Sequence, residues 1–469
     1  MNLPPQNTGF LAALPHSLRE RIVLLLPTFL LIVITANAPI AIAQNLDGPI
    51  PVVLLQSEDG YQLRRGGEPY FIKGVGGDAS KEILRDCGGN SFRTWGVDEK
   101  TLEQLDEAHR LGLCVTVGIW LGHTQHGFDY DDDDAVAKQL SDAARAVRQY
   151  KNHPAVLMWA LGNEMEINNE SAKLWPAIEQ LAAMVKEIDP LHPTMTVIAE
   201  LGQDNVEQIH RHCPSIDLIG VNSYGGAASL GKRYRTAGGT KPYLITEFGP
   251  PGTWETPVNR FGAAEELTST RKADFYREAY QSSVLGQPGL CLGSYAFHWG
   301  NKIEATATWF GMFLPDGSRL AAVDTMQELW NAHSPPLPCP KIIELKLTSN
   351  DQVPQGETVT AEVVIHNARQ PNTEQSSTEA LSIQWTLYRE QASYAVQGTG
   401  AAPSAFFPDA IQNNGSEKVR VIMPQSDGIY RLYCTVRNRS KNQVARAAVG
   451  SLPIEVNGNV TTSNSTRNN

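Results

Sequence analysis

The sequence predicts two folds in tandem, an α/β barrel of eight parallel strands, (β/α)₈, followed by a small all-β sandwich. Short apolar runs alternate with helical stretches between about residues 70 and 332, and eight of these runs have the character of strands. A proline-rich segment follows, and after it apolar and polar residues alternate. Eight repeated βα units fit a closed barrel. An open, doubly wound sheet is the alternative, but the first βα turn lacks the glycine fingerprint of nucleotide-binding folds.

The N-terminal segment is typical of an export signal. After Arg21, residues 22–43 carry no charge and end in Ala-Ile-Ala, the small-x-small pattern at which signal peptidases cut. The run is also long enough to span a bilayer, so an uncleaved anchor that attaches the protein to a membrane is the alternative. Residues 1–43 are therefore predicted to be a signal peptide or an N-terminal anchor. The rest of the chain is expected to be secreted, periplasmic or at the cell surface.

The strands of the barrel can be placed in order along the chain. Each is a short apolar run, and helical stretches separate them. The predicted strands are Phe71–Val75, Ser91–Trp95, Cys114–Trp120, Val156–Leu161, Met195–Ala199, Leu218–Asn222, Tyr243–Thr246 and Leu292–Phe297. Apolar residues recur at helical spacing from Leu174 to Ile188, and another helix is expected from about Ala135 to Tyr150. The barrel domain is predicted to cover residues 44–335.

A stiff proline-rich connector, Ser334–Pro340, precedes the second predicted domain, residues 341–457. Four alternating stretches predict strands of a β-sandwich. They are Thr358–His366, Leu381–Leu387, Lys418–Ile422 and Tyr430–Val436, and Trp385 is expected in the core. Because Cys434 has no cysteine on an earlier strand to pair with, an immunoglobulin-like sandwich without its disulfide fits best. The tail, residues 458–469, is rich in Asn, Ser and Thr and is expected to be disordered.

Composition and charge exclude several classes of protein. The 469 residues include 39 basic and 50 acidic side chains, a net charge of −11, whereas a protein that binds nucleic acid needs a basic contact surface. Apolar residues make up 41% of the chain, which is enough for a packed core. None of the six cysteines forms a CxxC pair, which argues against a zinc ribbon or a disulfide-stapled miniprotein. The sequence therefore predicts a globular protein with no nucleic-acid partner.

Two glutamates stand directly after predicted strands. Glu164 follows the fourth strand and Glu247 follows the seventh. In a barrel, side chains at the carboxyl ends of the strands face one mouth, so the two carboxyls are expected to meet there. Such a pair can cleave a glycosidic bond, because one carboxyl protonates the departing oxygen while the other attacks or stabilises the oxocarbenium-like centre. The competing interpretation is that both are solvated residues at strand ends.

The segments around these glutamates resemble clan A glycoside hydrolases. The segment Asn152–Glu164 is similar to the acid/base strand of the family 2 TIM barrel, and Thr246–Gly249 is similar to the nucleophile strand of the same clan. The similarity extends over the whole barrel, through Phe71–Val75, Asn90–Trp95, Ile219–Tyr224 and Tyr295–Trp299. The resemblance implies a retaining mechanism, with carboxyls about 5–5.5 Å apart and a covalent glycosyl-enzyme intermediate.

The resemblance also implies roles for the matching residues. Glu164 is expected to be the general acid/base and Glu247 the nucleophile, while Asn163 binds the sugar 2-hydroxyl. Arg93 is expected to keep Glu247 ionised through its nearby positive charge, and Tyr224 to orient it through a hydrogen bond. Pairing with a structural acid is the competing interpretation for Arg93, and packing is the competing interpretation for Tyr224.

Further aromatic and histidine side chains are candidate sugar-binding groups. From the resemblance, Trp299 is expected to form the floor of the subsite in which the sugar ring distorts. Trp95 and Trp120 are placed where their indoles can stack on sugar faces, although core packing is the alternative for every aromatic residue. His123, after the third strand, either binds sugar hydroxyls or caps a loop.

No metal or cofactor is predicted. Protonation by one carboxyl and attack by another suffice for the expected chemistry. The acidic run Asp129–Asp134 lacks the glycine and glutamate spacing of an EF-hand loop. It precedes a predicted helix, whose dipole favours acidic residues at its start. The run is therefore interpreted as a helix start and not as a calcium site.

Three functions fit this sequence. The preferred one is a retaining hydrolase of β-linked oligo- or polysaccharides; the alternatives are a β-glucan transglycosylase and a noncatalytic carbohydrate-binding protein. The opening Phe71–Val75 resembles fungal β-1,3-glucan transglycosylases. The short segment between residue 43 and the first strand leaves no room for the β-sandwich that precedes the barrel in full family 2 enzymes, which argues against a standard β-galactosidase or β-glucuronidase. A uronic acid substrate needs a cation, for which Lys302 and Arg260 are the candidates.

Overall fold

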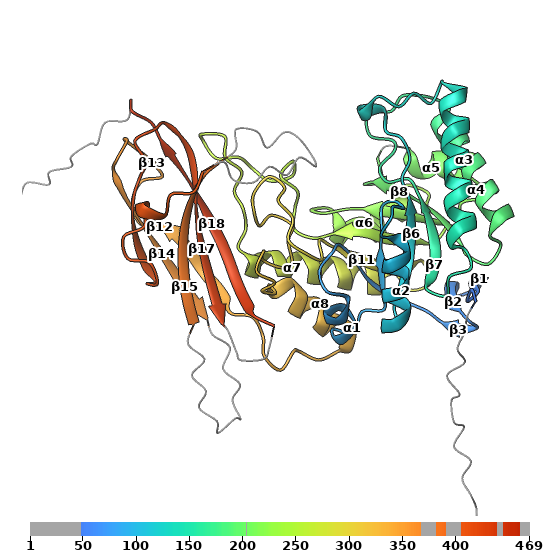
Figure 1. Cartoon of the computed structure of the whole chain (residues 1–469), viewed down its shortest axis with the longest axis horizontal. Helices are drawn as coiled ribbons and strands as arrows, with labels where there is room; N and C mark the ends of the chain where they lie inside the picture. The colour runs from blue at the N-terminus through green and yellow to red at the C-terminus, as the bar shows by residue number, and fades with distance from the viewer. Residues whose placement is uncertain (1–47, 203, 367–380, 391–404, 439–443, 460–469) are drawn as a thin grey trace, which may run out of the picture. The chain divides into compact units, whose positions relative to one another are not determined.

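The computed structural model describes residues 48–202, 204–366, 381–390, 405–438 and 444–459. Its main feature is a closed barrel of eight parallel strands in the order β10-β11-β4-β5-β6-β7-β8-β9 (Figure 1). The strands are β4 (Ile72–Gly76), β5 (Ser91–Arg93), β6 (Cys114–Ile119), β7 (Val156–Leu161), β8 (Thr194–Ala199), β9 (Leu218–Asn222), β10 (Tyr243–Phe248) and β11 (Cys291–Phe297). Each of the eight predicted strands is present within a few residues of its expected bounds, so the predicted barrel is confirmed.

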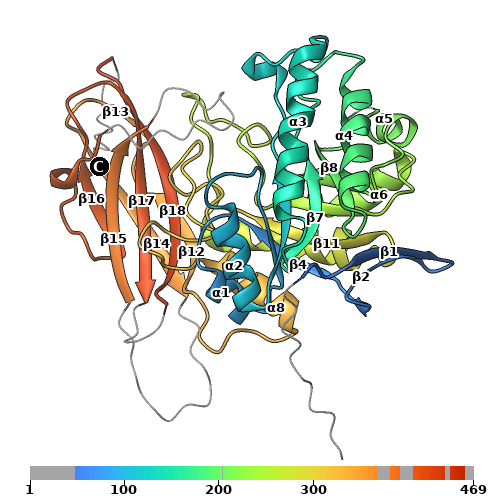
Figure 2. The ribbon, with the colours of Figure 1, turned by 45° about the vertical axis from the view of Figure 1, so that its right-hand side comes forward.

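Helices follow the strands and cover the outside of the barrel. They are α1 (Lys81–Asp86), α2 (Thr101–Leu111), α3 (Asp133–Tyr150), α4 (Leu174–Ile188), α5 (Asn205–His212), α6 (Leu230–Thr236), α7 (Ser269–Ala279) and α8 (Ala321–Asn331). Helices α3 and α4 lie side by side (Figure 2). Asp132 caps α3, because its side chain accepts hydrogen bonds from the backbone N–H groups of Asp134 and Ala135. The acidic run therefore begins a helix, as predicted.

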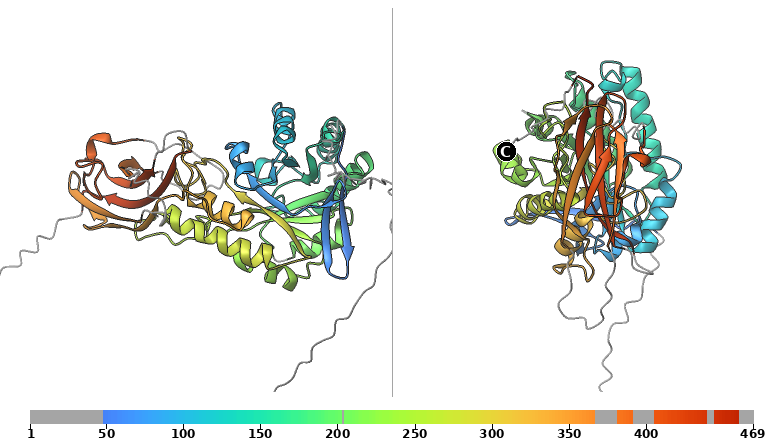
Figure 3. Two further views of the ribbon diagram at one scale, coloured as in Figure 1. Left: turned by 90° about the horizontal axis from the view of Figure 1, so that it is seen from below. Right: turned by 90° about the vertical axis from the view of Figure 1, so that its left-hand side faces the viewer.

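A small antiparallel sheet precedes the barrel, and the sequence analysis does not predict it. It consists of β1 (Val52–Ser57), β2 (Gly60–Arg65) and β3 (Glu68–Pro69), and β1 and β2 form the blue hairpin in Figure 3. Val52 and Leu63 are buried in a cluster with residues from the amino ends of the barrel strands, such as Leu218. The hairpin thus covers the amino end of the barrel, and the carboxyl ends of the strands form the mouth.

Two further sheets follow the proline-rich connector. One has the order β12-β14-β16 and the other has the order β13-β18-β17-β15. Their strands are β12 (Lys341–Leu347), β13 (Gln352–Val353), β14 (Thr358–His366), β15 (Leu381–Arg389), β16 (Lys418–Ile422), β17 (Gly428–Asn438) and β18 (Arg446–Val456). Both sheets contribute to one apolar core around the buried Trp385, as expected. The four predicted strands are present, β12, β13 and β18 are additional, and the immunoglobulin-like assignment and the domain limits stay predictions.

A buried ionic cluster joins the barrel to the second pair of sheets. Glu266, ahead of α7, forms an ion pair with Lys272 of α7 at 2.5 Å, and Ser451 of β18 donates a hydrogen bond to its other oxygen at 2.8 Å. Arg431 of β17 donates to the backbone carbonyl of Ala264 at 2.9 Å. Lys272 and Arg431 are almost entirely buried. Charges that are buried in this way need their partners, so this cluster fixes the two regions against each other.

The predicted N-terminal signal or anchor lies outside the described residues, as does the tail from residue 460. Within the described part of the chain, no helix is long and apolar enough to cross a membrane. Membrane attachment and export therefore stay predictions. All six cysteines of the chain are described, and each is buried with a free thiol.

Candidate active site

Glu247 lies near the carboxyl end of β10, and three side chains from neighbouring strand ends donate hydrogen bonds to its carboxylate. Trp95 Nε1 and Arg93 NH1 donate to Oε1 at 2.8 and 3.2 Å, and the Tyr224 hydroxyl donates to Oε2 at 2.7 Å. Arg93 and Glu247 are both buried, so solvent screens their ion pair little. Burial and the Glu247 charge raise the pKa of Tyr224 well above its usual value, so the phenol stays protonated and donates. The site stabilises a carboxylate anion at Glu247.

Glu164 follows β7 and has a different environment. The one side-chain donor described for it is the Asn222 amide, whose Nδ2 lies 2.8 Å from its Oε1. Burial raises the pKa of Glu164 to about 7, and the negative charge of Glu247 adds to the rise. At neutral pH this carboxyl therefore carries a proton in a large fraction of molecules, unlike an exposed glutamate.

A short hydrogen-bonded network connects the two glutamates. Arg93 NH1 reaches Glu247, while its NH2 donates to Asn163 Oδ1 at 3.0 Å. Asn222 Nδ2 lies within hydrogen-bond distance of Glu164 Oε1 and also of Asn163 Oδ1, at 3.2 Å. The two carboxyls thus lie in one mouth, although 83 residues separate them in sequence. The predicted meeting of Glu164 and Glu247 agrees with this geometry.

Comparison with known proteins finds a family that the barrel resembles. Residues 90–286 match the family described as glycosyl hydrolases family 2, TIM barrel domain. The barrel of this chain is thus similar to the family 2 glycosyl hydrolase barrel. The resemblance to clan A glycoside hydrolases is confirmed by this match.

Curated relatives of the family 2 barrel include β-glucuronidases. The chain is 25% identical to human β-glucuronidase over 181 residues, which cover 35% of this chain and 26% of that protein. It is 26% identical to the enzyme from Streptococcus agalactiae over 256 residues, which cover 46% of this chain and 40% of that protein. The matched regions are thus well under two thirds of each relative. The similarity to these glycosyl hydrolases concerns the barrel alone.

Solved structures that are similar to this chain also include β-glucuronidases. The β-D-glucuronidase of Dictyoglomus thermophilum superposes with a TM-score of 0.47 and 16% identity, over 60% of this chain and 54% of that chain. The Ruminococcus gnavus β-glucuronidase superposes with a TM-score of 0.48 and 15% identity, over 61% of this chain and 53% of that chain. The strand order described above is the evidence for the fold, and these superpositions add nothing to it.

The backbone of Glu164 has an uncommon conformation. Its φ is 57°, in the left-handed region that costs a side-chain-bearing residue about 1–2 kcal/mol. Two contacts hold this turn: the Glu164 N–H donates to the Val197 carbonyl at 2.8 Å, and Glu166 Oε1 accepts from the Ala199 N–H at 2.6 Å. The neighbouring strand β8 therefore maintains the strained turn that presents Glu164. The sequence gives no sign of this turn.

Trp299 does not occupy the position predicted for it. Its side chain is fully buried in the main core, where the indole N–H donates to the Ser80 carbonyl at 3.2 Å and the ring meets Phe313 edge-on. The chain leaves β11 before residue 299, and the indole turns into the apolar core of the molecule instead of the mouth. Phe297, the last residue of β11, lies at the site instead of Trp299. Its ring lies 6.0 Å from the rings of both Trp95 and Tyr224.

His123 and Trp120 lie together after β6. Their rings stack at 5.0 Å with an interplanar angle of 28°. His123 is 4% exposed, and neither ring nitrogen has a hydrogen-bond partner in the structure, although the ring lies near the backbone of Asn163. Trp120, by contrast, is 51% exposed. The predicted sugar-binding positions of His123, Trp120 and Trp95 thus all fall around the mouth.

Lys302 and Arg260 are the two cations proposed for a sugar carboxylate, and the structure places Lys302 at the site. Lys302 lies 4.8 Å from the centre of the Phe297 ring and pairs with Glu304 at 3.0 Å. Arg260 pairs instead with Asp351 of the C-terminal region at 2.5 Å. Within the described residues, no group of three or more His, Cys, Asp or Glu side chains is placed to hold a metal ion.

Proposed function

We propose that this protein is a retaining glycoside hydrolase of β-linked glycans, with Glu247 as nucleophile and Glu164 as general acid/base. The observation that carries the proposal is the unequal surroundings of two carboxyls in one mouth. Three donors, one of them a guanidinium, stabilise the Glu247 anion, whereas burial raises the pKa of Glu164 to about 7. A double displacement needs one ionised and one protonated carboxyl in this arrangement.

The reaction proceeds in two steps. In the first, Glu164 donates its proton to the glycosidic oxygen while a Glu247 oxygen attacks the anomeric carbon, which forms a glycosyl ester and releases the shortened glycan. In the second, ionised Glu164 takes a proton from water, and the resulting hydroxyl displaces Glu247 from the sugar. Two inversions leave the released sugar with the configuration of the substrate.

Other residues position the sugar. The side-chain oxygen of Asn163 accepts bonds from Arg93 and Asn222, so the amide nitrogen is directed to the ligand, where it binds the sugar 2-hydroxyl. The unpartnered ring nitrogens of His123 bind further hydroxyls. Trp95 and Phe297 supply the aromatic wall of the subsite. We also infer, from the charge-free segment 22–43, that the protein acts outside the cytoplasm.

The identity of the sugar that the protein hydrolyses can be tested directly. The curated relatives described above are β-glucuronidases, and Lys302 beside Phe297 is the cation available to a sugar carboxylate. The full chain is assayed with 4-nitrophenyl β-glucoside, β-galactoside, β-mannoside, β-xyloside, β-glucuronide and β-galacturonide. A uronidase is expected to lose selectivity for uronides over neutral sugars in Lys302→Met. A neutral-sugar hydrolase retains its selectivity in that variant.

Product stereochemistry tests the mechanism. Proton NMR during the first minutes of hydrolysis should show the β anomer of the released sugar before mutarotation. Initial release of the α anomer would refute the retaining mechanism, and the absence of release from every glycoside would support the noncatalytic alternative. Adding a β-glucan acceptor separates hydrolysis from transglycosylation, because only a transglycosylase makes longer products.

A further inference from the structure

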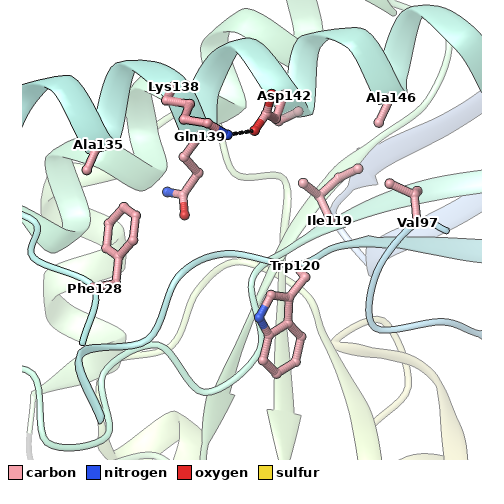
Figure 4. Close-up of a pocket in the computed structure, with 10 residues that line it drawn as sticks. Val97, Ile119, Trp120, Phe128, Ala135, Lys138, Gln139, Asp142 and Ala146 are labelled. Carbon is pink, nitrogen blue, oxygen red and sulfur yellow. Dashed lines mark hydrogen bonds and ion pairs between the residues drawn. The ribbon is translucent and has the colours of Figure 1, made fainter. Parts of the chain in front are cut away.

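A groove lies beside the candidate active site, between helix α3 and the carboxyl ends of β5 and β6 (Figure 4). Its volume is about 340 Å³, within the range of small-ligand pockets. Apolar side chains such as Ile119, Phe128 and Ala135 line it, and Trp120 presents its half-exposed indole. Polar groups, including Gln139 and the Lys138–Asp142 ion pair, stand along the helix side. The groove thus combines an aromatic face with a hydrogen-bonding rim.

Trp120 is close to the catalytic groups on one side through the turn after β5. A Cβ placed on Gly96 would lie 3.2 Å from the Trp120 Cβ, so the backbone of Gly96 rests directly on this tryptophan. The preceding residue, Trp95, donates its indole N–H to Glu247. The tryptophan that contacts Glu247 and the glycine that contacts Trp120 are therefore consecutive residues.

On the other side, His123 connects Trp120 to the acid/base strand. The imidazole stacks on Trp120 and lies near the backbone of Asn163, the neighbour of Glu164. Both ring nitrogens are buried without a partner in the structure. His123 does not itself line the groove, so its role here is to support the Trp120 indole by stacking on it.

We propose that this groove is a subsite for a second sugar unit, which stacks on Trp120 and hydrogen-bonds to the polar rim formed by Lys138, Gln139 and Asp142. A pyranose has an apolar C–H face and a rim of hydroxyls, which match the indole face and the polar rim of the groove. Gln139 accepts the Gly122 N–H with its oxygen at 2.6 Å and also bonds to the Tyr130 hydroxyl, so its amide is held in a fixed position at the rim of the groove. The proposal rests on the proposed function and deepens it: the substrate is a β-linked oligo- or polysaccharide, not a single sugar on a non-sugar group.

Direct binding tests this subsite without turnover. The full chain carrying Glu247→Gln is titrated, by tryptophan fluorescence and calorimetry, with glucose, cellotriose, laminaritriose, xylotriose and mannotriose. At least one trisaccharide is expected to bind roughly tenfold or more tightly than the corresponding monosaccharide, because it covers the indole face. Adding Trp120→Ala should remove that preference, whereas Trp120→Phe should keep part of it. If no trisaccharide binds more tightly than its monosaccharide, the proposal is wrong.

Two further variants separate stacking from a general disturbance. Ala135→Leu fills the groove from α3 without altering Trp120, and it should remove the trisaccharide preference as Trp120→Ala does. Leu285→Ala changes an exposed apolar residue outside the mouth, and it should keep the preference. A preference that survives both Trp120→Ala and Ala135→Leu would place the second sugar elsewhere and overturn the proposal. If the protein hydrolyses aryl monoglycosides but shows no preference for trisaccharides, the subsite is refuted and the proposed function stands. If it binds trisaccharides but hydrolyses no glycoside, the proposed function alone is refuted.

Discussion

The ends of β7 and β10 each present a glutamate to the same mouth, yet they provide opposite environments. At β10, Glu247 accepts hydrogen bonds from an indole, a guanidinium and a phenol. At β7, Glu164 has one described amide donor, and burial together with the Glu247 charge raises its pKa to about 7. Both carboxyls are largely shielded from water. The two environments differ in the number and charge of the donors that reach each carboxyl.

Removing the β10 carboxyl should have the largest effect. Glu247→Ala is expected to lower kcat/KM by roughly 10⁴-fold or more, because it removes the carboxylate that forms the glycosyl ester. Hydrolysis of the best aryl glycoside from the panel measures it, with circular dichroism to check folding. Glu207→Ala, an exposed glutamate on α5, is the control and should retain full activity. A loss of less than tenfold would mean that Glu247 is not the nucleophile.

Removing the proton of the β7 carboxyl should have the next largest effect. Glu164→Gln keeps the shape and the Asn222 contact but cannot donate a proton, so kcat is expected to fall by about 10²- to 10⁴-fold on substrates with poor leaving groups. Aryl glycosides with acidic phenols need little protonation and should be affected much less. An equal loss on both kinds of substrate would contradict the role of general acid.

The contrast also predicts a pH profile. Because the first step needs protonated Glu164, whose pKa is about 7, kcat/KM should fall as the pH rises through 7. Between pH 7 and pH 9 the decrease should be about 50-fold, because the protonated fraction falls from about one half to about one hundredth. The fall on the alkaline side should be absent in Glu164→Gln. If it persists there, another group limits the rate.

Weakening the β10 environment by one donor should have a moderate effect. Tyr224→Phe removes the bond to Glu247 Oε2 but leaves those from Arg93 and Trp95 to Oε1. We expect kcat/KM to fall about tenfold, the equivalent of one charge-assisted hydrogen bond. Steady-state kinetics of both proteins measure this change. A loss as large as that of Glu247→Ala would show that the other two donors do not hold the carboxylate.

A second buried carboxyl near β7 affects stability instead. Burial raises the pKa of Glu166 to about 8, far above the value of about 4.3 for an unfolded chain, so its contribution to the free energy of unfolding is present at acid pH and is lost as the pH rises towards 8. Glu166→Gln keeps the acceptor for the Ala199 N–H. The variant should be more stable than the parent by up to about 5 kcal/mol at pH 8, the equivalent of this rise in pKa, and equal to it near pH 4.5. Urea denaturation at the two pH values measures this, and equal stability at pH 8 would contradict it.

The sequence predicts the barrel well because parallel strands are buried on both faces and appear as short apolar runs. All eight runs are strands, with Val156–Leu161 matching to the residue. The hairpin β1–β2 has no such pattern, since Val53 and Leu55 are exposed while Val52 and Leu63 are buried. Its place is set by contacts with the amino end of the barrel, which local patterning does not reveal.

The site is predicted less completely, because the sequence does not show in which direction a side chain points or which residues distant in sequence are in contact. The motif match finds Glu164, Glu247, Arg93 and Tyr224, but it expects Trp95 to stack on a sugar and not to bond to Glu247. It also places Trp299 at the site, where the structure has Phe297. The error is two residues at the point where the chain leaves β11, and no periodicity describes side-chain direction there. Asn222 was predicted only as the last residue of a strand, although it contacts both Glu164 and Asn163. Its signal is its position immediately ahead of Ser223-Tyr224.

The ionic cluster around Glu266 has a consequence for how the molecule comes apart. Arg431 of β17 reaches the Ala264 carbonyl, and Ala264 packs with Phe297, which contacts both Trp95 and Tyr224. Cutting the chain at the proline connector would remove the Ser451 hydrogen bond from Glu266 and the Arg431 hydrogen bond from Ala264, and so loosen the packing around Phe297. The barrel and the C-terminal sheets should consequently unfold in a single calorimetric transition. A truncated protein that lacks the C-terminal sheets should have no catalytic activity.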